Sequence, residues 1–136
     1  MNLYDYLEDK LSTFYEREEV VRTIEHLNLT QSVNEIVNAF KKQKMQTLDK
    51  AILPLIENAD TQVKTIEDVK KRLKVYERNV NNYDQILKEL QSNIIYPALI
   101  IHTPKHGYYL VAGNTRLMVS IVNDIPLKVQ IVELED

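Results

Sequence analysis

The sequence predicts an α+β protein, with a helical N-terminal half followed by a small mixed α/β unit. Up to about residue 92, apolar residues recur every three or four positions, which is the spacing of amphipathic helices. From Asn93 onward the period changes, and short runs rich in β-branched residues alternate with turn-forming residues. We therefore divide the chain into a helical region, residues 1–78, and an α/β domain, residues 79–136.

Composition narrows the classes of function. The chain has 136 residues, a net charge of −3 and no cysteine, which excludes disulfides and thiolate chemistry. No apolar run approaches the roughly 18 residues of a membrane span, and the acidic N-terminus is unlike a secretory signal. We therefore expect a cytoplasmic protein with no membrane partner. The negative net charge provides no overall attraction to nucleic acid, so a DNA contact would need a local basic patch.

Helix starts are indicated by pairs of residues that have the spacing of a capping box. These pairs are Thr13 with Glu16, Ser32 with Glu35, and Thr65 with Asp68. Between the last two pairs, residues 47–58 have apolar residues on one side of a helix, with Pro54 inside the stretch. Because proline cannot continue a helix without losing a hydrogen bond, we expect a helix that is kinked at Pro54 or begins there.

The strongest helical signal is a stripe of apolar residues at alternating spacings of three and four. Its members are Ile66, Val69, Leu73, Tyr76, Val80, Tyr83, Leu87 and Leu90. Two interpretations fit this stripe: a long amphipathic helix that packs on its own core, and a coiled coil that forms a homodimer through the helical region. The asparagine-rich run at residues 79–82 is a poor helix former, so the helix is also expected to break there.

The α/β domain reads as helix, strand, hairpin, strand, helix and strand. The predicted strands are residues 94–102, 108–112 and 125–134, and the helix starts near Thr115 and is ended by Asn123 and Asp124. In the last strand, Leu127, Val129 and Ile131 alternate with Lys128, Gln130 and Val132. This order predicts a small mixed α/β unit.

Both glycines of the chain lie in this domain, at turns. Gly107 follows Lys105 and His106 in the hairpin, where a positive φ explains it. Gly113 lies between a strand and a helix, where it permits an unusual backbone angle and omits a side chain that would keep a ligand away. The peptide N–H groups at the helix start, together with Arg116 in the first turn, make a typical anion site. The alternative is that Asn114 or Thr115 caps the helix and Arg116 is solvated.

Residues 83–134 resemble the ParB/sulfiredoxin superfamily, in particular the short versions from phages and mobile elements. Members share a helix, a strand with a proline, a hairpin, and a strand that runs into a Gly-x-x-Arg turn and a helix. Here Pro97 stands at the proline, and Gly113, Asn114, Thr115 and Arg116 stand at the box. The box is similar to the Gly-His-Thr-Arg form of free-serine kinases, with asparagine replacing histidine.

The resemblance implies a nucleotide-binding protein that uses ATP or CTP with Mg²⁺. It implies phosphate or nucleotide contacts from Pro97 and from Gly113, Asn114, Thr115 and Arg116, with Asn114 and Arg116 as the catalytic candidates. The activity it implies is phosphoryl transfer to a hydroxyl acceptor, such as a modified base in DNA. Asparagine cannot act as a general base near neutral pH. A base is therefore not identified, and the candidates Asp84, Glu89 and Asp124 remain open.

Two other functions stay open. One is a non-catalytic module that senses a nucleotide or binds a protein partner. The other is a DNA-binding protein or nuclease that uses the basic stretches at residues 40–44 and 69–74, which are also ordinary for solvated helix faces. Lys105 and His106, at the hairpin tip, are further candidates to approach the phosphate. The three histidines form no pattern typical of a metal site, so we expect no structural zinc.

Overall fold

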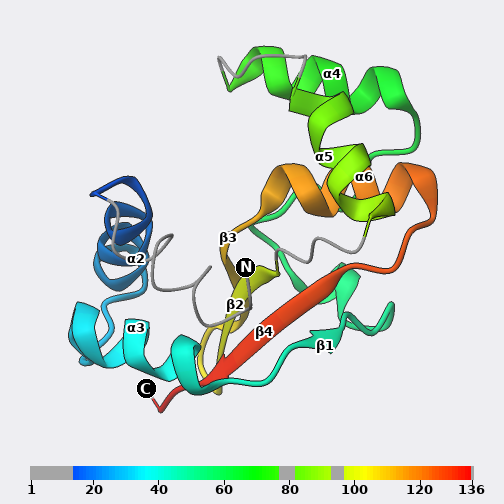
Figure 1. The fold of residues 1–136 in the computed structure, drawn as a ribbon. Coiled ribbons are helices and arrows are strands. Elements are labelled where there is room, and N and C mark those ends of the chain that lie inside the picture. Colours follow the sequence, from blue (N-terminus) through cyan, green and yellow to red (C-terminus); the bar gives the residue numbers. More distant parts are fainter. Residues whose placement is uncertain (1–13, 77–81, 93–96, 136) are drawn as a thin grey trace.

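The computed structural model describes residues 14–76, 82–92 and 97–135. In this part, helices surround a four-stranded mixed sheet (Figure 1). The elements, in chain order, are α2 (Phe14–Leu27), α3 (Val33–Lys42), β1 (Gln46–Thr47), the 3₁₀ helix η1 (Leu53–Leu55), α4 (Ile66–Val75), α5 (Asn82–Gln91), β2 (Ala98–Thr103), β3 (Gly107–Ala112), α6 (Asn114–Asn123) and β4 (Lys128–Glu133). The α+β class is therefore confirmed.

The strands lie in the order β1-β4-β2-β3, with β4 parallel to β2 and the other neighbours antiparallel. The hairpin of β2 and β3 contains a bulge near its open end, because Leu99 pairs with Ala112 while Ile100 pairs with Leu110. Val111 is the extra residue. A bulge bends its strand and changes the direction in which the chain leaves the sheet, and here the chain enters α6 directly.

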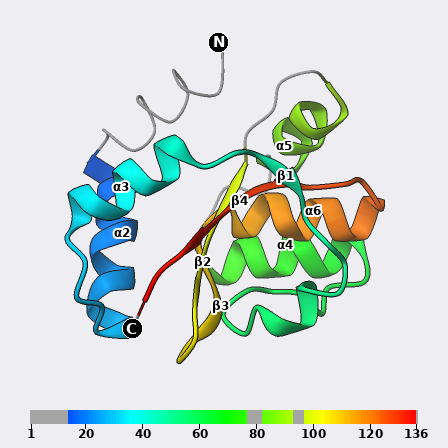
Figure 2. The ribbon, with the colours of Figure 1, turned by 90° about the horizontal axis from the view of Figure 1, so that it is seen from below.

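The helices form a layer on each side of the sheet. Figure 2 shows α2 and α3 on one face and α6 on the other, with α4 and α5 beyond the sheet on the α6 side. Alternate residues of β2 point to opposite faces, so Leu99 and Ile101 pack with α2 and α3, whereas Ala98 and Ile100 pack with α6. A third cluster joins α4 and α5 to the outer side of α6 through residues such as Leu73 and Met118. The N-terminal helices α2 and α3 and the C-terminal strands therefore pack together in one of these clusters.

Several sequence predictions are confirmed locally. Ser32 caps α3 and Thr65 caps α4, each in a complete capping box. The predicted Thr13 cap lies outside the described residues. Gly107 has a φ of +67° in the hairpin turn, and α6 ends at Asn123 with Asp124 in a left-handed conformation.

Residues 47–58 do not form the expected amphipathic helix. The stretch contains only the three-residue helix η1, with Pro54 in its first turn. Just before it, β1 pairs with β4. The N-terminal half is therefore not purely helical. Proline is tolerated at the start of a helix because the N–H that it lacks has no partner within the helix there. The apolar side chain of Ile56 is buried beside the sheet instead of on a helix face.

The heptad stripe is divided between α4 and α5, and its member Val80 lies outside the described residues. Val69, Leu73 and Tyr83 are buried against α6. These residues pack within their own chain, as the first of the two interpretations expects. A homodimer remains a prediction.

Candidate functional site

The turn before α6 depends on Gly113 for two physical reasons. Its φ is +106°, a conformation that residues with a side chain rarely adopt. A Cβ built on it would also lie 2.7 Å from the Cβ of Ala98 and 2.9 Å from its Cα. The expectation that this glycine leaves room for a ligand is therefore wrong, because the missing side chain faces β2. It lets the turn pack tightly against the sheet, and this contact fixes where α6 begins.

No side chain in the described part of the chain caps the N-terminus of α6. Gly113 occupies the cap position and accepts the first helical hydrogen bond, from the N–H of Leu117 at 2.9 Å. The alternative that Asn114 or Thr115 caps the helix is therefore wrong. Because the first N–H groups of a helix have no partner within the helix, the peptide donors of Asn114 and Thr115 are positioned to bind an acceptor from outside it.

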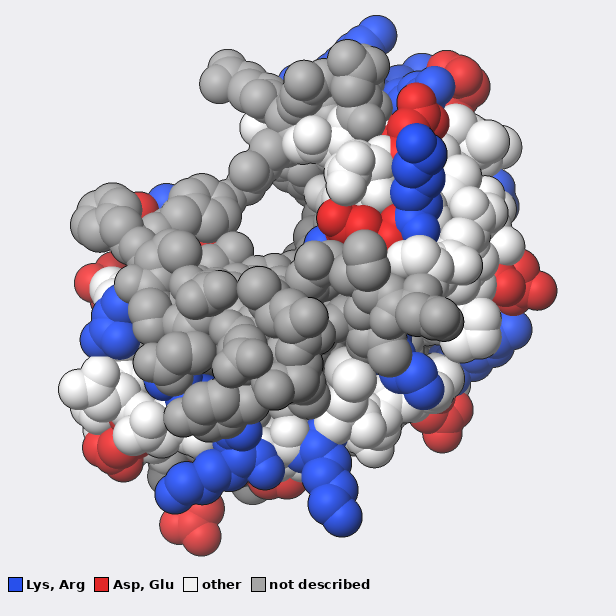
Figure 3. Space-filling view, in the orientation of Figure 1, with Lys and Arg blue, Asp and Glu red and all other residues white. Residues whose placement is uncertain are grey.

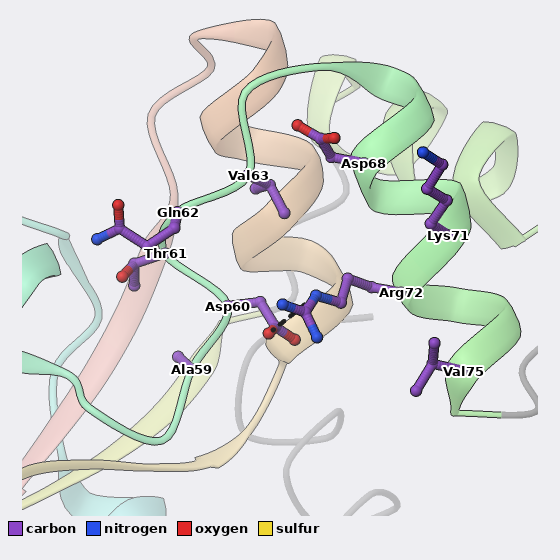
Figure 4. A pocket seen from close by; sticks show the side chains of 9 residues that line it. All are labelled: Ala59, Asp60, Thr61, Gln62, Val63, Asp68, Lys71, Arg72 and Val75. Carbon is purple, nitrogen blue, oxygen red and sulfur yellow. Dashed lines mark ion pairs between the residues drawn. The ribbon is translucent and has the colours of Figure 1, made fainter.

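Asn114 is held by Asp60. The Asn114 amide donates to Asp60 Oδ2 at 2.8 Å, and its Oδ1 accepts from the Asp60 peptide N–H at 3.1 Å. The Tyr76 hydroxyl donates to the same Oδ2 at 2.7 Å. The Arg72 guanidinium lies 3.6 Å from Oδ1 (Figure 4). The hydrogen bond to Asp60 raises the pKa of Tyr76 above its ordinary value. Both polar atoms of the Asn114 side chain are thus engaged within the protein.

Asp60 reaches this position because the segment before it runs along the edge of β3. Ile56 forms a bridge with Tyr108. The Asn58 side chain then donates to the Leu110 carbonyl and accepts from its N–H, both at 2.8 Å. Asn58 therefore replaces a neighbouring strand at this edge. The pattern of apolar residues gives no signal for this pairing, and it does not identify Asp60.

Arg116 forms an ion pair with Glu89 of α5, with 2.6 Å between Nη2 and Oε2. Both side chains are largely buried, with exposed fractions of 15% and 16%. Of the open candidates for a base, Glu89 is therefore the one that contacts the box. Asp84 is exposed on α5, and Asp124 pairs with Lys50 at the opposite end of α6. The guanidinium is fixed near the start of α6, but its charge is partly neutralised.

A cleft of about 640 Å³ opens at this helix start, between the α2 side and the α6 side of the molecule. Figure 3 shows acidic and basic side chains close together on the α4–α6 side of the molecule. Its lining residues come from α2, the segment after η1, the end of β3, the α6 start and the α4–α5 region: Glu19, Arg22, Asn58, Tyr76, Asn82, Ile86, Leu110, Val111, Ala112, Gly113, Asn114, Thr115 and Arg116. The whole Gly113–Arg116 box therefore borders one cleft.

The charges that line the cleft are mixed. Arg22 contacts Glu19 at 3.0 Å and Glu18 at 4.0 Å, and Arg116 is paired with Glu89. An anion that enters the cleft would have to share these arginines with carboxylates. The cleft can thus offer peptide donors and guanidinium groups, but not a strongly positive field.

Other predicted site residues lie elsewhere. Pro97 is buried directly before β2 and is not among the described residues that line the cleft. Lys105 and His106 lie at the closed end of the hairpin, whereas Gly113 follows its open end. The length of β3 separates these ends by roughly 17 Å, at about 3.3 Å per residue. The expectation that Lys105 or His106 approaches the same phosphate is therefore wrong.

A second hollow of about 590 Å³ lies between residues 59–63 and α4 (Figure 4). Asp60 and Arg72 pair across it, and Asp68 and Lys71 line it further along α4. Hydrogen bonds from the Lys64 and Thr65 peptides lower the pKa of Asp68. Acidic and basic groups balance here, and the Asp60 network separates this hollow from the cleft.

The described residues contain no group of three or more histidine, cysteine, aspartate or glutamate side chains placed to hold a metal ion. None of the helices in the described ranges is long and apolar enough to cross a membrane.

Comparison of the chain with protein-family models, with curated proteins and with solved structures finds no match. The resemblance to the ParB/sulfiredoxin superfamily therefore stays a prediction from the sequence.

Proposed function

We propose that this chain is a ParB-like protein that binds a nucleotide, ATP or CTP, with its phosphates at the start of α6. The observation that supports this most is the N-terminus of α6, which no side chain among the described residues caps and which opens into a cleft beside Arg116. Helix N-termini carry partial positive charge and unpaired donors, and both favour a phosphate. A cleft of about 640 Å³ is large enough for a nucleotide.

Arg116 and Glu89 determine how strongly the phosphates bind. Glu89 holds the guanidinium in place, and it also competes with the ligand for the same positive charge. Because a guanidinium has five donors, it can bind Glu89 and a phosphate together. Mg²⁺ would enter on the nucleotide and would be held mainly by phosphate oxygens, since it keeps several waters and needs few protein ligands.

Phosphoryl transfer to a hydroxyl acceptor is the catalytic form of this proposal. Arg116 would neutralise the charge that develops on the transferred group. Asn114, whose side-chain amide is bound to Asp60, would instead position the turn that presents the peptide donors. A nucleotide sensor without catalysis is the second candidate function, and the restraint of Asn114 by Asp60 and Arg116 by Glu89 favours it. Steady turnover of bound nucleotide supports the first form, and binding without turnover supports the second.

The test is calorimetric titration of the folded chain with ATP and CTP, each with and without Mg²⁺. Arg116→Gln should weaken nucleotide binding about tenfold or more, because a hydrogen bond to a charged group contributes roughly 1.5–3 kcal/mol. Glu89→Gln should strengthen binding, because it releases the guanidinium from its competitor. These opposite changes are specific to a phosphate bound at Arg116.

Lys50→Gln is the matched control. It removes the same charge from another ion-paired cation, in the exposed pair with Asp124 at the far end of α6. We expect it to leave affinity nearly unchanged. If neither nucleotide binds, or if Arg116→Gln and Lys50→Gln weaken binding equally, the proposed site is wrong.

A further inference from the structure

We propose that Tyr76 is a stacking surface for the base of the bound nucleotide. This inference rests on the proposed function and extends it, because it assigns a role to the part of the cleft away from the phosphates. It predicts that the ligand must carry a planar ring, which separates nucleotides from inorganic polyphosphate and from sugar phosphates.

Val69 and Leu73, in the middle of the apolar stripe of α4, are completely buried, whereas Ile66 at its start is 44% exposed. Tyr76 continues this stripe, and 47% of its surface is exposed. It lies at the end of α4 and lines the cleft together with Ile86 of α5. An aromatic side chain is therefore presented to the cleft that contains the α6 N-terminus.

The side chain of Tyr76 is held in place. Its hydroxyl donates to Asp60 Oδ2, the atom that also accepts from the Asn114 amide. Its peptide N–H donates to the Arg72 carbonyl at 3.0 Å, and the Arg72 side chain pairs with the same carboxylate. One carboxylate thus ties the ring of Tyr76 to the first residue of α6. A ring that is already fixed loses little conformational freedom when a ligand stacks on it.

A ligand bound in this way would place its phosphates at the α6 start and its ring against Tyr76 and Ile86. Stacking of a base on an aromatic side chain depends little on the identity of the base. We therefore expect Tyr76 to support ATP and CTP similarly. Loss of the stacking contact with Tyr76 should weaken nucleotide binding roughly five- to hundredfold.

The competing role for Tyr76 is purely structural, through its hydroxyl and Asp60. Two substitutions separate the roles. Tyr76→Phe keeps the ring and removes the hydrogen bond to Asp60. Tyr76→Leu removes the ring as well and leaves a shorter apolar side chain, and the half-exposed position limits the effect on folding.

The experiment measures dissociation constants of MgATP, MgCTP and inorganic triphosphate for the unmodified chain and both variants. We expect the unmodified chain to bind the nucleotides more tightly than triphosphate. Tyr76→Leu should weaken both nucleotides at least fivefold without changing triphosphate binding, whereas Tyr76→Phe should retain most of the nucleotide affinity. Chemical unfolding of each variant confirms that the proteins compared are folded.

Three outcomes overturn the inference. If triphosphate binds as tightly as the nucleotides, the proposed phosphate site stands but the ring contributes nothing. If Tyr76→Leu weakens all three ligands equally, or changes none, Tyr76 is structural. If none of the ligands binds to the unmodified chain, the proposed function fails as well.

Discussion

Substitution of Gly113 by alanine should destabilise the protein much more than the same change at Gly107. At both positions alanine must adopt a positive φ, +106° and +67° respectively. That conformation costs roughly 1–2 kcal/mol, and about 0.4–1 kcal/mol is regained because alanine restricts the unfolded chain. A Cβ at Gly107 meets nothing within 4 Å, so Gly107→Ala should cost about 1 kcal/mol.

At Gly113 a steric clash with Ala98 adds to the cost of the positive φ. The new Cβ would lie 2.7 Å from Ala98 Cβ and 2.9 Å from its Cα, and the second of these atoms belongs to the backbone of a central strand. Neither can move aside as a flexible side chain would. Overpacking of this kind costs roughly 1–3 kcal/mol. We therefore expect Gly113→Ala to lower the free energy of unfolding by roughly 2–4 kcal/mol, a large part of the 5–15 kcal/mol typical of a domain.

Urea unfolding of the two variants beside the unmodified chain measures the difference. Ala98→Gly in the Gly113→Ala background should restore part of the loss, because it removes the Cβ but not the Cα of residue 98. Equal destabilisation by the two glycine substitutions would show that the close approach to β2 does not determine the turn.

Other predictions concern the surrounding network. Asp68→Asn should lower stability at neutral pH, and the difference from the unmodified chain should shrink as pH falls below about 4. The reason is that a carboxyl whose pKa lies below its ordinary 3.8 stabilises the fold only while it is ionised. Urea midpoints across that pH range test this, and a difference that stays constant contradicts it. In a double-mutant cycle, Arg116→Gln and Glu89→Gln should show a coupling of about 1–3 kcal/mol in the free energy of unfolding. The reason is that each single change leaves a largely buried charge without its ion-pair partner. Additive effects of the two changes would mean that the ion pair does not form. In an alkaline absorbance titration, Tyr76→Phe should remove one tyrosine whose pKa lies above the ordinary 10.0, because the hydrogen bond to Asp60 raises the pKa of Tyr76. The stabilisation from that bond should disappear as pH rises through the raised pKa, and loss of a normally titrating tyrosine instead would argue against the bond.

The sequence predicts those features that depend on local spacing. Ser32 and Thr65 cap their helices because a capping box needs only residues three apart. The glycine turn before α6 is equally predictable from the change of period at Gly113. Features that depend on distant segments were not predictable in this way. β1 is two residues long and exists only because it pairs with β4.

Gln130 illustrates the same limit. In β4, Gln130 lies on the other side of the strand from Val129 and Ile131, where the alternation predicts solvent-facing residues, yet it is completely buried. Its side-chain amide donates to the carbonyls of Phe40 and Gln43, at the end of α3. Alternation predicts which side of a strand a residue occupies, but it does not reveal that a helix from the other half of the chain covers that side.

At the candidate site, the sequence identified the Gly113–Arg116 turn but not the groups that hold it. Glu89 was one of several acidic residues without a distinguishing pattern, and Asp60 lies in a segment with no periodic signal. Both act through side-chain contacts between elements far apart in the chain. These contacts decide that Asn114 is turned toward Asp60 and that Arg116 is shared with a carboxylate.

Titration of the ¹⁵N-labelled protein with MgATP and MgCTP, followed through its backbone amide resonances, tests the phosphate site most directly. We predict that the largest shifts occur at the peptide N–H groups of Asn114, Thr115 and Arg116, and that they saturate. Shifts centred on the lysines of α3 or α4, or no response of the α6 start to either nucleotide, would contradict the assignment of this helix N-terminus as the site that binds phosphate.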